Sequence, residues 1–208
     1  MANSTKRFLT HKNIIDDFIL TPCFFSTELN WDKIIQEAET YAKNYCEKDP
    51  EDPLQWEIHI PLTRKYSKLI AEIENADTRI VDLAAILHDT GKYMGRENHH
   101  IRSHELAKTF LAEQDLFDSD RELVLKCILK HRTRYTGESD PIEVKIIRSA
   151  DILAVLFDDI WQSKSRKNMS REALISIYDK AYQDIELETA KKIAKPQLAL
   201  LKEQLMHQ

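Results

Sequence analysis

Apolar residues recur three and four positions apart along almost the whole chain, and this spacing most restricts its fold. Residues at those intervals share one face of an α-helix. No stretch alternates apolar and polar residues over the length of a strand, and only three of the 208 residues are glycine, which leaves few positions for hairpin turns. The sequence therefore predicts an all-α fold. We expect helices at about residues 30–47, 58–75, 78–90, 103–114, 119–132, 141–160 and 170–206.

Short polar side chains precede several of these helices and predict where they begin. Asn30, Asp77 and Ser170 stand just before apolar-periodic segments, and their oxygens are suited to accept a hydrogen bond from the first helical turn. Ser103 and Ser119 predict two further starts. Residues 47–55 and 132–141 read as turn-rich links, and the length suits one well-packed domain.

Composition and charge argue against several classes of protein. The net charge of −5 does not favour a nucleic acid polymer or an anionic membrane, so a phosphate-bearing ligand would need local cations. The three cysteines lie far apart and contain no C-x-x-C pair, which indicates reduced thiols rather than a disulfide framework or a zinc knuckle. There is no signal-peptide core or membrane-length apolar stretch, so the expected location is cytoplasmic.

Four ionisable residues fall on apolar helix faces, where burial is costly unless each has a partner. His59, His88 and His131 extend apolar stripes, and Asp151 stands inside the apolar segment "IIRSADILAVLF". Taken singly, each histidine is more often a hydrogen-bonded core residue, and Arg148 could pair with Asp151 one helical turn away. If the four residues meet in space, however, one bound cation would be a partner for several of them and would offset the cost of burying them. Imidazole and carboxylate ligands suit iron, manganese, cobalt or zinc.

The order of these residues resembles the HD superfamily of metal-dependent phosphohydrolases. "AAILHDTGK" is similar to the family's "aalLHDiGK", and "VKIIRSADILAV" to its "ekiirdADrLda". "NHHIRSHELAKTFL" and "LKCILKH" resemble the two histidine segments that lie between them. The resemblance covers about residues 56–160. It implies an HD-type helical bundle at 56–160, an N-terminal segment and helix at 1–55 that pack on it, and C-terminal helices at 161–208 that complete the domain.

The resemblance also implies a set of metal ligands. Those of a first metal would be His59, His88, Asp89 and Asp151. Asp89 could bridge to a second metal, with His131 and either His99 or His100 as the further ligands. His104 falls where the family usually has alanine, so we expect it to support the packing rather than bind metal. The implied cofactor is one or two divalent transition-metal ions: iron, manganese, cobalt, nickel or zinc.

Cationic residues near these ligands are candidates for contact with a phosphate. Lys92 matches the lysine of the family's "HDiGK", placed to meet a phosphate oxygen or the leaving group, and with Asp89 it forms the expected catalytic pair. Four arginines lie near the ligand segments and could bind phosphate, although a solvated surface position is the alternative for each: Arg96, Arg102, Arg132 and Arg134.

The implied activity is hydrolysis of a nucleotide or related phosphate ester by metal-activated water. Two alternatives keep the same scaffold: a diiron oxygenase, and a non-catalytic nucleotide-sensing module. The chain lacks the "HHE" and "GYP" elements of the cyclic-dinucleotide branch and the "HDtvED" of the (p)ppGpp hydrolases, so neither specificity is supported. We expect the partner to be a small phosphorylated substrate, and the terminal helices leave a homodimer contact open.

Overall fold

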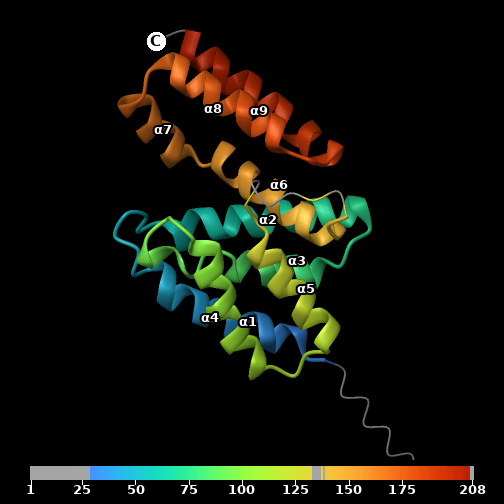
Figure 1. The fold of residues 1–208 in the computed structure, drawn as a ribbon. Coiled ribbons are helices and arrows are strands. Elements are labelled where there is room, and N and C mark those ends of the chain that lie inside the picture. Colours follow the sequence, from blue (N-terminus) through green and yellow to red (C-terminus); the bar gives the residue numbers. More distant parts are fainter. Residues whose placement is uncertain (1–28, 133–136, 138, 207–208) are drawn as a thin grey trace, which may run out of the picture.

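The described part of the chain is built from helices and contains no strand, which confirms the predicted all-α fold (Figure 1). The computed structural model describes residues 29–132, 137 and 139–206. Within these residues the α-helices are α1 (Trp31–Cys46), α2 (Ile60–Glu74), α3 (Thr78–Leu87), α4 (His99–Ala112), α5 (Asp118–Leu129), α6 (Ile142–Leu156), α7 (Asp159–Asn168), α8 (Arg171–Asp184) and α9 (Glu188–Met206). A π-helical turn (Gln55–His59) precedes α2, and a 3₁₀ turn (Lys92–Met94) follows α3.

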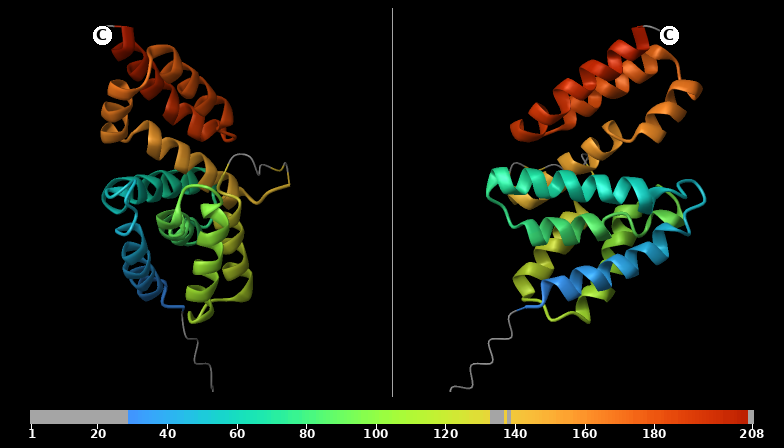
Figure 2. Two further views of the ribbon diagram at one scale, coloured as in Figure 1. Left: turned by 60° about the vertical axis from the view of Figure 1, so that its left-hand side comes forward. Right: turned by 180° about the vertical axis from the view of Figure 1, so that it is seen from behind.

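Helix α3 lies at the centre of the molecule, and its residues 80–87 are all buried. It packs against α1, α2, α5 and α6, and the left view of Figure 2 looks along it with its neighbours around it. Helices α8 and α9 pack side by side at the C-terminal end, where α9 contacts α2 and α6 (Figure 1). The apolar stripe of α3 therefore ends at His88 and Asp89 inside the protein. None of the described helices is both long and apolar enough to cross a bilayer.

The predicted caps at Asn30, Asp77 and Ser170 are present. Each side-chain oxygen accepts a hydrogen bond from a backbone N–H in the first turn of its helix. Ser103 and Ser119 do not begin helices, because α4 starts at His99 and α5 at Asp118. The earlier start of α4 has a consequence for the candidate ligands: it moves His99 and His100 from a loop into the first helical turn.

Two helices predicted as continuous are each divided in the structure. The segment 141–160 breaks at Asp158, which lies between α6 and α7. Its side chain accepts a hydrogen bond from the backbone N–H of Trp161 and so caps α7. The segment 170–206 breaks after α8, where Ile185 is buried in an extended conformation and Glu186 reaches the guanidinium of Arg148. The prediction for 141–160 was wrong because the hydrogen bond of Asp158 outweighs local helix propensity. The prediction for 170–206 was wrong because the ion pair of Glu186 with buried Arg148 has the same effect.

Gly91 allows the turn after α3 to lie against α4. A Cβ atom on Gly91 would lie 2.5 Å from the backbone nitrogen of Ser103, and the Gly91 N–H donates to the Ser103 hydroxyl at 2.9 Å. We expect Gly91→Ala to lower the free energy of unfolding by about 1–3 kcal/mol, because backbone cannot move aside as a flexible side chain can. Urea denaturation measures this, with Lys108→Ala on the exposed face of α4 as the control expected to change by less than about 0.5 kcal/mol. Equal stability of the two variants would contradict the close contact.

Candidate metal centre

Five separate elements bring the predicted ligands to one place in the structure. His59 ends the π-helical turn, His88 and Asp89 directly follow α3, and Asp151 lies on α6. His99 opens α4, and His131 stands two residues beyond α5. Pro61 occupies the first turn of α2, a position that tolerates proline, so it does not disturb the placement of His59.

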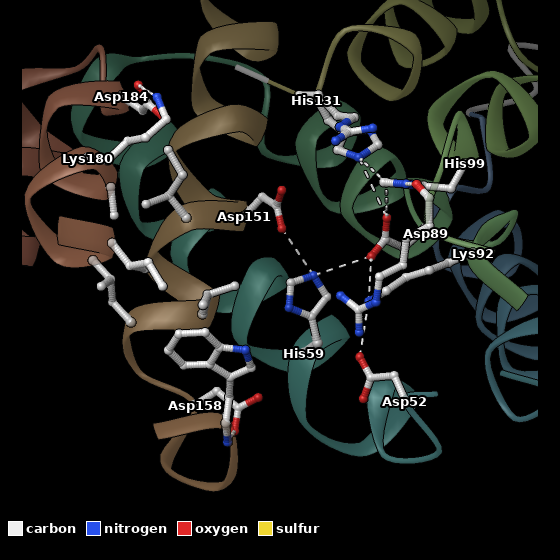
Figure 3. Close-up of a pocket in the computed structure, with 18 of the residues that line it drawn as sticks. Asp52, His59, Asp89, Lys92, His99, His131, Asp151, Asp158, Lys180 and Asp184 are labelled. Atoms are coloured by element: carbon white, nitrogen blue, oxygen red, sulfur yellow. Dashed lines mark hydrogen bonds and ion pairs between the residues drawn. The ribbon is translucent and has the colours of Figure 1, made fainter. Parts of the chain in front are cut away.

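A first cluster, defined as His59, His88, Asp151 and the Oδ2 atom of Asp89, has its donor atoms close together. The Nε2 atoms of His59 and His88 lie 3.3 Å apart. Asp89 Oδ2 lies 3.6 Å from His59 Nε2 and 3.7 Å from His88 Nε2. Asp151 Oδ1 lies 3.1 Å from His59 Nε2 (Figure 3). The same oxygen lies 3.8 Å from His88 Nε2. Four N and O donors thus converge from three parts of the fold.

A second cluster, defined as His99, His131 and the Oδ1 atom of Asp89, shares that carboxylate with the first. The Nε2 atoms of His99 and His131 lie 3.0 Å apart. Asp89 Oδ1 lies 3.0 Å from His99 Nε2 and 3.6 Å from His131 Nε2. The two oxygens of Asp89 therefore face different clusters, as in a carboxylate that bridges two cations. Two sets of three residues have ligand atoms close enough to hold a metal ion: His59, His88 and Asp89 in the first cluster, and Asp89, His99 and His131 in the second.

Backbone carbonyls orient three of the imidazoles. The Nδ1 atoms of His88, His99 and His131 lie 2.7–2.8 Å from the carbonyl oxygen three residues earlier in each case. A carbonyl oxygen can only accept, so Nδ1 carries a proton, and in the neutral imidazole Nε2 is then free to present its lone pair to the cluster. This is the tautomer that binds metal through Nε2, with the other ring nitrogen held by the protein.

The surroundings of the buried Asp89 carboxylate show that these residues fit a cation. Asp89 Oδ1 is buried, yet it accepts no hydrogen bond from the residues that the structure describes. Instead, the Nε2 atoms of His99 and His131 face it, and each carries a lone pair when its imidazole is neutral. Lone pairs that converge in this way repel one another unless a positive charge lies among them, so the donor set fits a divalent metal.

The protonation states also suit a cation. Burial raises the pKa of Asp89, but His88, Lys92 and His99 hold it well below its ordinary value, so the carboxylate is ionised. Burial lowers the pKa of His131 to about 3, and His88 adds to this shift, which keeps the imidazole neutral. Burial would lower the pKa of His99, but the Asp89 carboxylate raises it, so a metal would take the place of the proton there.

The structure distinguishes residues that the sequence left open. His99, not His100, has its ring nitrogen at the second cluster, whereas His100 is buried beside the rings of His99 and His131. His104 lies outside both clusters and contacts Glu105. The Asp151 carboxylate pairs with His59 and not with Arg148, which binds Asp140 and Glu186 instead.

The predicted phosphate-binding cations have different positions. Lys92 is buried, with Nζ 3.3 Å from Asp89 Oδ2 and 3.0 Å from Asp52 Oδ2. Arg96 and Arg132 line the pocket beside the clusters. Arg102 does not line it, because its guanidinium donates to the carbonyl oxygens of Gly91 and Gly95 and holds that turn. Arg134 lies outside the described residues.

The sequence analysis missed two site residues, both in the segment interpreted as a link. Gln55 is buried in the π-helical turn and donates to Asp89 Oδ2 at 3.2 Å. Asp52 lines the pocket and accepts from Lys92. Only their position shortly before His59 could have signalled this role, because neither lies in a periodic segment.

These residues surround one end of a cavity of about 460 Å³. Eight of the predicted ligands and cations line it directly: His59, Asp89, Lys92, Arg96, His99, His131, Arg132 and Asp151. Its other end is formed by α6, α7 and α8. Such a volume lies in the range of small-molecule sites.

Known proteins share this fold. Residues 57–156 match the family model of the HD domain. A predicted HD superfamily hydrolase from an uncultured Thermotogales bacterium aligns with a TM-score of 0.61 at 21% identity, over 83% of this chain and 89% of its own. An HD-superfamily hydrolase from Bacillus thuringiensis gives 0.62 at 21%, over 85% and 95%. Bacillus subtilis YpgQ, solved in complex with ADP, gives 0.61 at 18%, over 85% and 94%. No curated protein matches the chain.

The family match confirms the resemblance predicted from the sequence. It spans residues 57–156, which include all four expected ligands of the first metal, from His59 to Asp151. The solved structures extend the likeness of fold over the C-terminal helices as well. Residues 57–156 are therefore an HD domain, and the chain shares its fold with the solved HD superfamily hydrolases.

Proposed function

We propose that this protein is a metal-dependent phosphohydrolase that acts on a nucleotide or a related phosphate ester. The observation that carries the proposal is the double use of Asp89, whose two oxygens face two separate groups of histidine nitrogens at the wall of a pocket. A buried ammonium, Lys92, stands beside the same carboxylate. The ADP bound to the similar structure YpgQ supports a nucleotide as the substrate class.

The chain's own residues would divide the work of hydrolysis. His59, His88 and Asp151 would hold one cation, His99 and His131 a second, and Asp89 would contact both. When bound, divalent cations lower the pKa of water and neutralise charge that develops on phosphoryl oxygens. Phosphoryl transfer otherwise requires that the substrate be positioned and that the charge of the transition state be stabilised, which fixed side chains can do.

Lys92 is suited to bind the phosphate. Burial would lower the pKa of Lys92, but the carboxylates of Asp89 and Asp52 raise it, so the ammonium stays charged. A phosphate oxygen that enters the pocket would replace Asp52 as the acceptor for Nζ. Asp52 therefore holds the lysine side chain in place before substrate arrives.

A screen of the purified protein against phosphate esters tests the proposal. The panel contains nucleoside mono-, di- and triphosphates and simple phosphomonoesters, each with manganese, iron, cobalt, nickel or magnesium. We expect metal-dependent release of phosphate or pyrophosphate from at least one nucleotide. A metal-loaded protein that hydrolyses none of them would contradict the proposal, and oxygen consumption by an iron-loaded sample would favour the diiron oxygenase.

We expect Lys92→Met to keep its metal but lose activity, because an ammonium acts on the phosphate rather than on the metal. The predicted loss in kcat/KM is about tenfold or more, or at least about 1.4 kcal/mol of transition-state stabilisation. Steady-state kinetics and elemental analysis measure the two effects. The control is Lys48→Met, at an exposed lysine in the preceding segment. Unchanged kcat/KM in Lys92→Met would remove this residue from the mechanism.

We expect the metal centre to hold two ions, and His131→Ala to hold one. His131 contributes only to the second cluster, so its loss leaves the His59 and His88 donors in place. Metal-to-protein ratios after anaerobic loading should be near two for the wild type and fall towards one in the variant. His104→Ala is the matched control, since that histidine shares α4 with His99 but lies outside both clusters. A ratio of one in every protein would exclude the second ion.

A further inference from the structure

The cavity has two chemically different ends. The end described above is ionic, with the carboxylates, imidazoles and cations of the candidate metal centre. The opposite end is mainly apolar and aromatic, and its side chains come from three consecutive helices: Ile152, Val155 and Leu156 of α6, Trp161 of α7, and Ile177, Tyr178 and Ala181 of α8. A ligand that fills such a cavity needs a phosphate at one end and a flat, weakly polar group at the other.

Most of the second end lies outside the matched family region. The HD model stops at residue 156, whereas Trp161 and the α8 residues follow it. The sequence analysis expected these helices to complete the domain or to form a dimer contact. The C-terminal region, and not the matched HD domain, therefore supplies most of the side chains at this end of the pocket.

Trp161 is held in position by hydrogen bonds around it. Its backbone N–H donates to Asp158 at 2.8 Å, which fixes the start of α7. The next residue, Gln162, is buried, and its amide nitrogen donates to the Val155 carbonyl at 3.0 Å. The Tyr178 hydroxyl donates to the Gln162 side-chain oxygen at 2.5 Å and ties α8 to α7. Because these bonds fix the backbone at Trp161, only the side-chain rotations of the indole remain to be restricted when a ligand packs on it.

A charged pair stands at the edge of the apolar end. Lys180 Nζ lies 2.9 Å from Asp184 Oδ2, and both residues line the cavity. Figure 3 shows them across the pocket from Asp89 and His99. They place one hydrogen-bond donor and one acceptor next to apolar surface, the combination that the edge of a nucleobase requires.

We propose that the α6–α8 end of the cavity is a nucleobase subsite, in which the base stacks on Trp161 with its polar edge towards Lys180 and Asp184. The inference rests on the proposed function for the position of the phosphate, and it adds the part of the substrate that the metal centre does not contact. Aromatic stacking of a base is worth about 1–3 kcal/mol when the aromatic residue is replaced by alanine, which corresponds to roughly 5–150-fold in affinity. An alkyl phosphate would use the apolar walls but could form no hydrogen bond with Lys180 or Asp184 through its alkyl chain.

Binding measurements test the subsite without need of turnover. The probes are the methylene-bridged analogue of ADP and methylenediphosphonate, which has the same bridged phosphonate pair without the nucleoside. Isothermal titration with manganese present gives both Kd values for the full-length protein. We expect the ratio of the two affinities to fall at least about tenfold in Trp161→Ala and to recover largely in Trp161→Phe. Ile160→Ala, on the neighbouring exposed position of α7, should keep the wild-type ratio.

Several results would overturn the subsite. They are an unchanged ratio in Trp161→Ala, equal affinity of the wild type for both probes, and an octyl phosphonate that binds as tightly as the ADP analogue. The last would mean that the end selects apolar bulk rather than a base. If no phosphate ester is hydrolysed but the ratio depends on Trp161, the subsite is supported and the hydrolase proposal fails.

Discussion

Asp89→Ala is expected to weaken metal binding by more than about 100-fold and to abolish metal-dependent turnover. Asp89 is the only described residue that reaches both clusters, with Oδ2 toward His59 and His88 and Oδ1 toward His99 and His131. Loss of a residue that merely supports a ligand costs about 10–100-fold in metal affinity, so loss of a shared ligand should cost more. Elemental analysis after exhaustive loading, and metal titration, measure the effect directly.

The fold should survive this change. The surrounding histidines keep their backbone hydrogen bonds in this variant, and Lys92 keeps Asp52 as a partner, so the helical core should remain folded. Glu51→Ala is the matched control, because this exposed carboxylate pairs with Arg96 near the site but contacts neither cluster. Wild-type metal content in Asp89→Ala, with circular dichroism unchanged, would show that the two clusters do not hold metal.

Arg148→Met is expected to lower the free energy of unfolding by about 3–5 kcal/mol. Arg148 is completely buried, and its guanidinium binds Asp140 at 2.9 Å and Glu186 at 2.5 and 3.1 Å. Methionine fills a similar volume but leaves both carboxylates without this charged partner. For a protein of this size, the change corresponds to a drop in Tm of at least about 6 °C.

An exposed ion pair provides the contrast. Lys33→Met removes the pair with Glu37, in which both side chains are largely exposed, and should change stability by less than about 1 kcal/mol. Adding Asp140→Asn and Glu186→Gln to Arg148→Met should recover part of the loss, because a neutral amide is less costly to bury than a carboxylate that has lost its arginine partner. A loss in Arg148→Met no larger than that of Lys33→Met would contradict the buried network.

The sequence by itself determined the all-α class, most of the helices and the family. Helical spacing of apolar residues is a local property, and burial of one face per helix follows from it directly. The ligand series was also visible, because His59, His88 and Asp151 are ionisable residues at positions where the periodicity requires burial. These signals do not depend on how the helices are arranged in space.

The tertiary structure decided which side chains meet. Whether His99 or His100 faces His131 depends on the rotation of α4, and Asn98, in the left-handed conformation, starts that helix one turn before Ser103. Arg148 lies one helical turn from Asp151 yet pairs with Asp140 and Glu186, since hydrogen bonds formed across the fold replace the nearest partner in sequence. The place of Trp161 in the cavity likewise depends on the break at Asp158, which turns α7 away from the line of α6. Periodicity specifies which face of each helix is buried, but the contacts between buried faces depend on rotations and breaks that only packing can select.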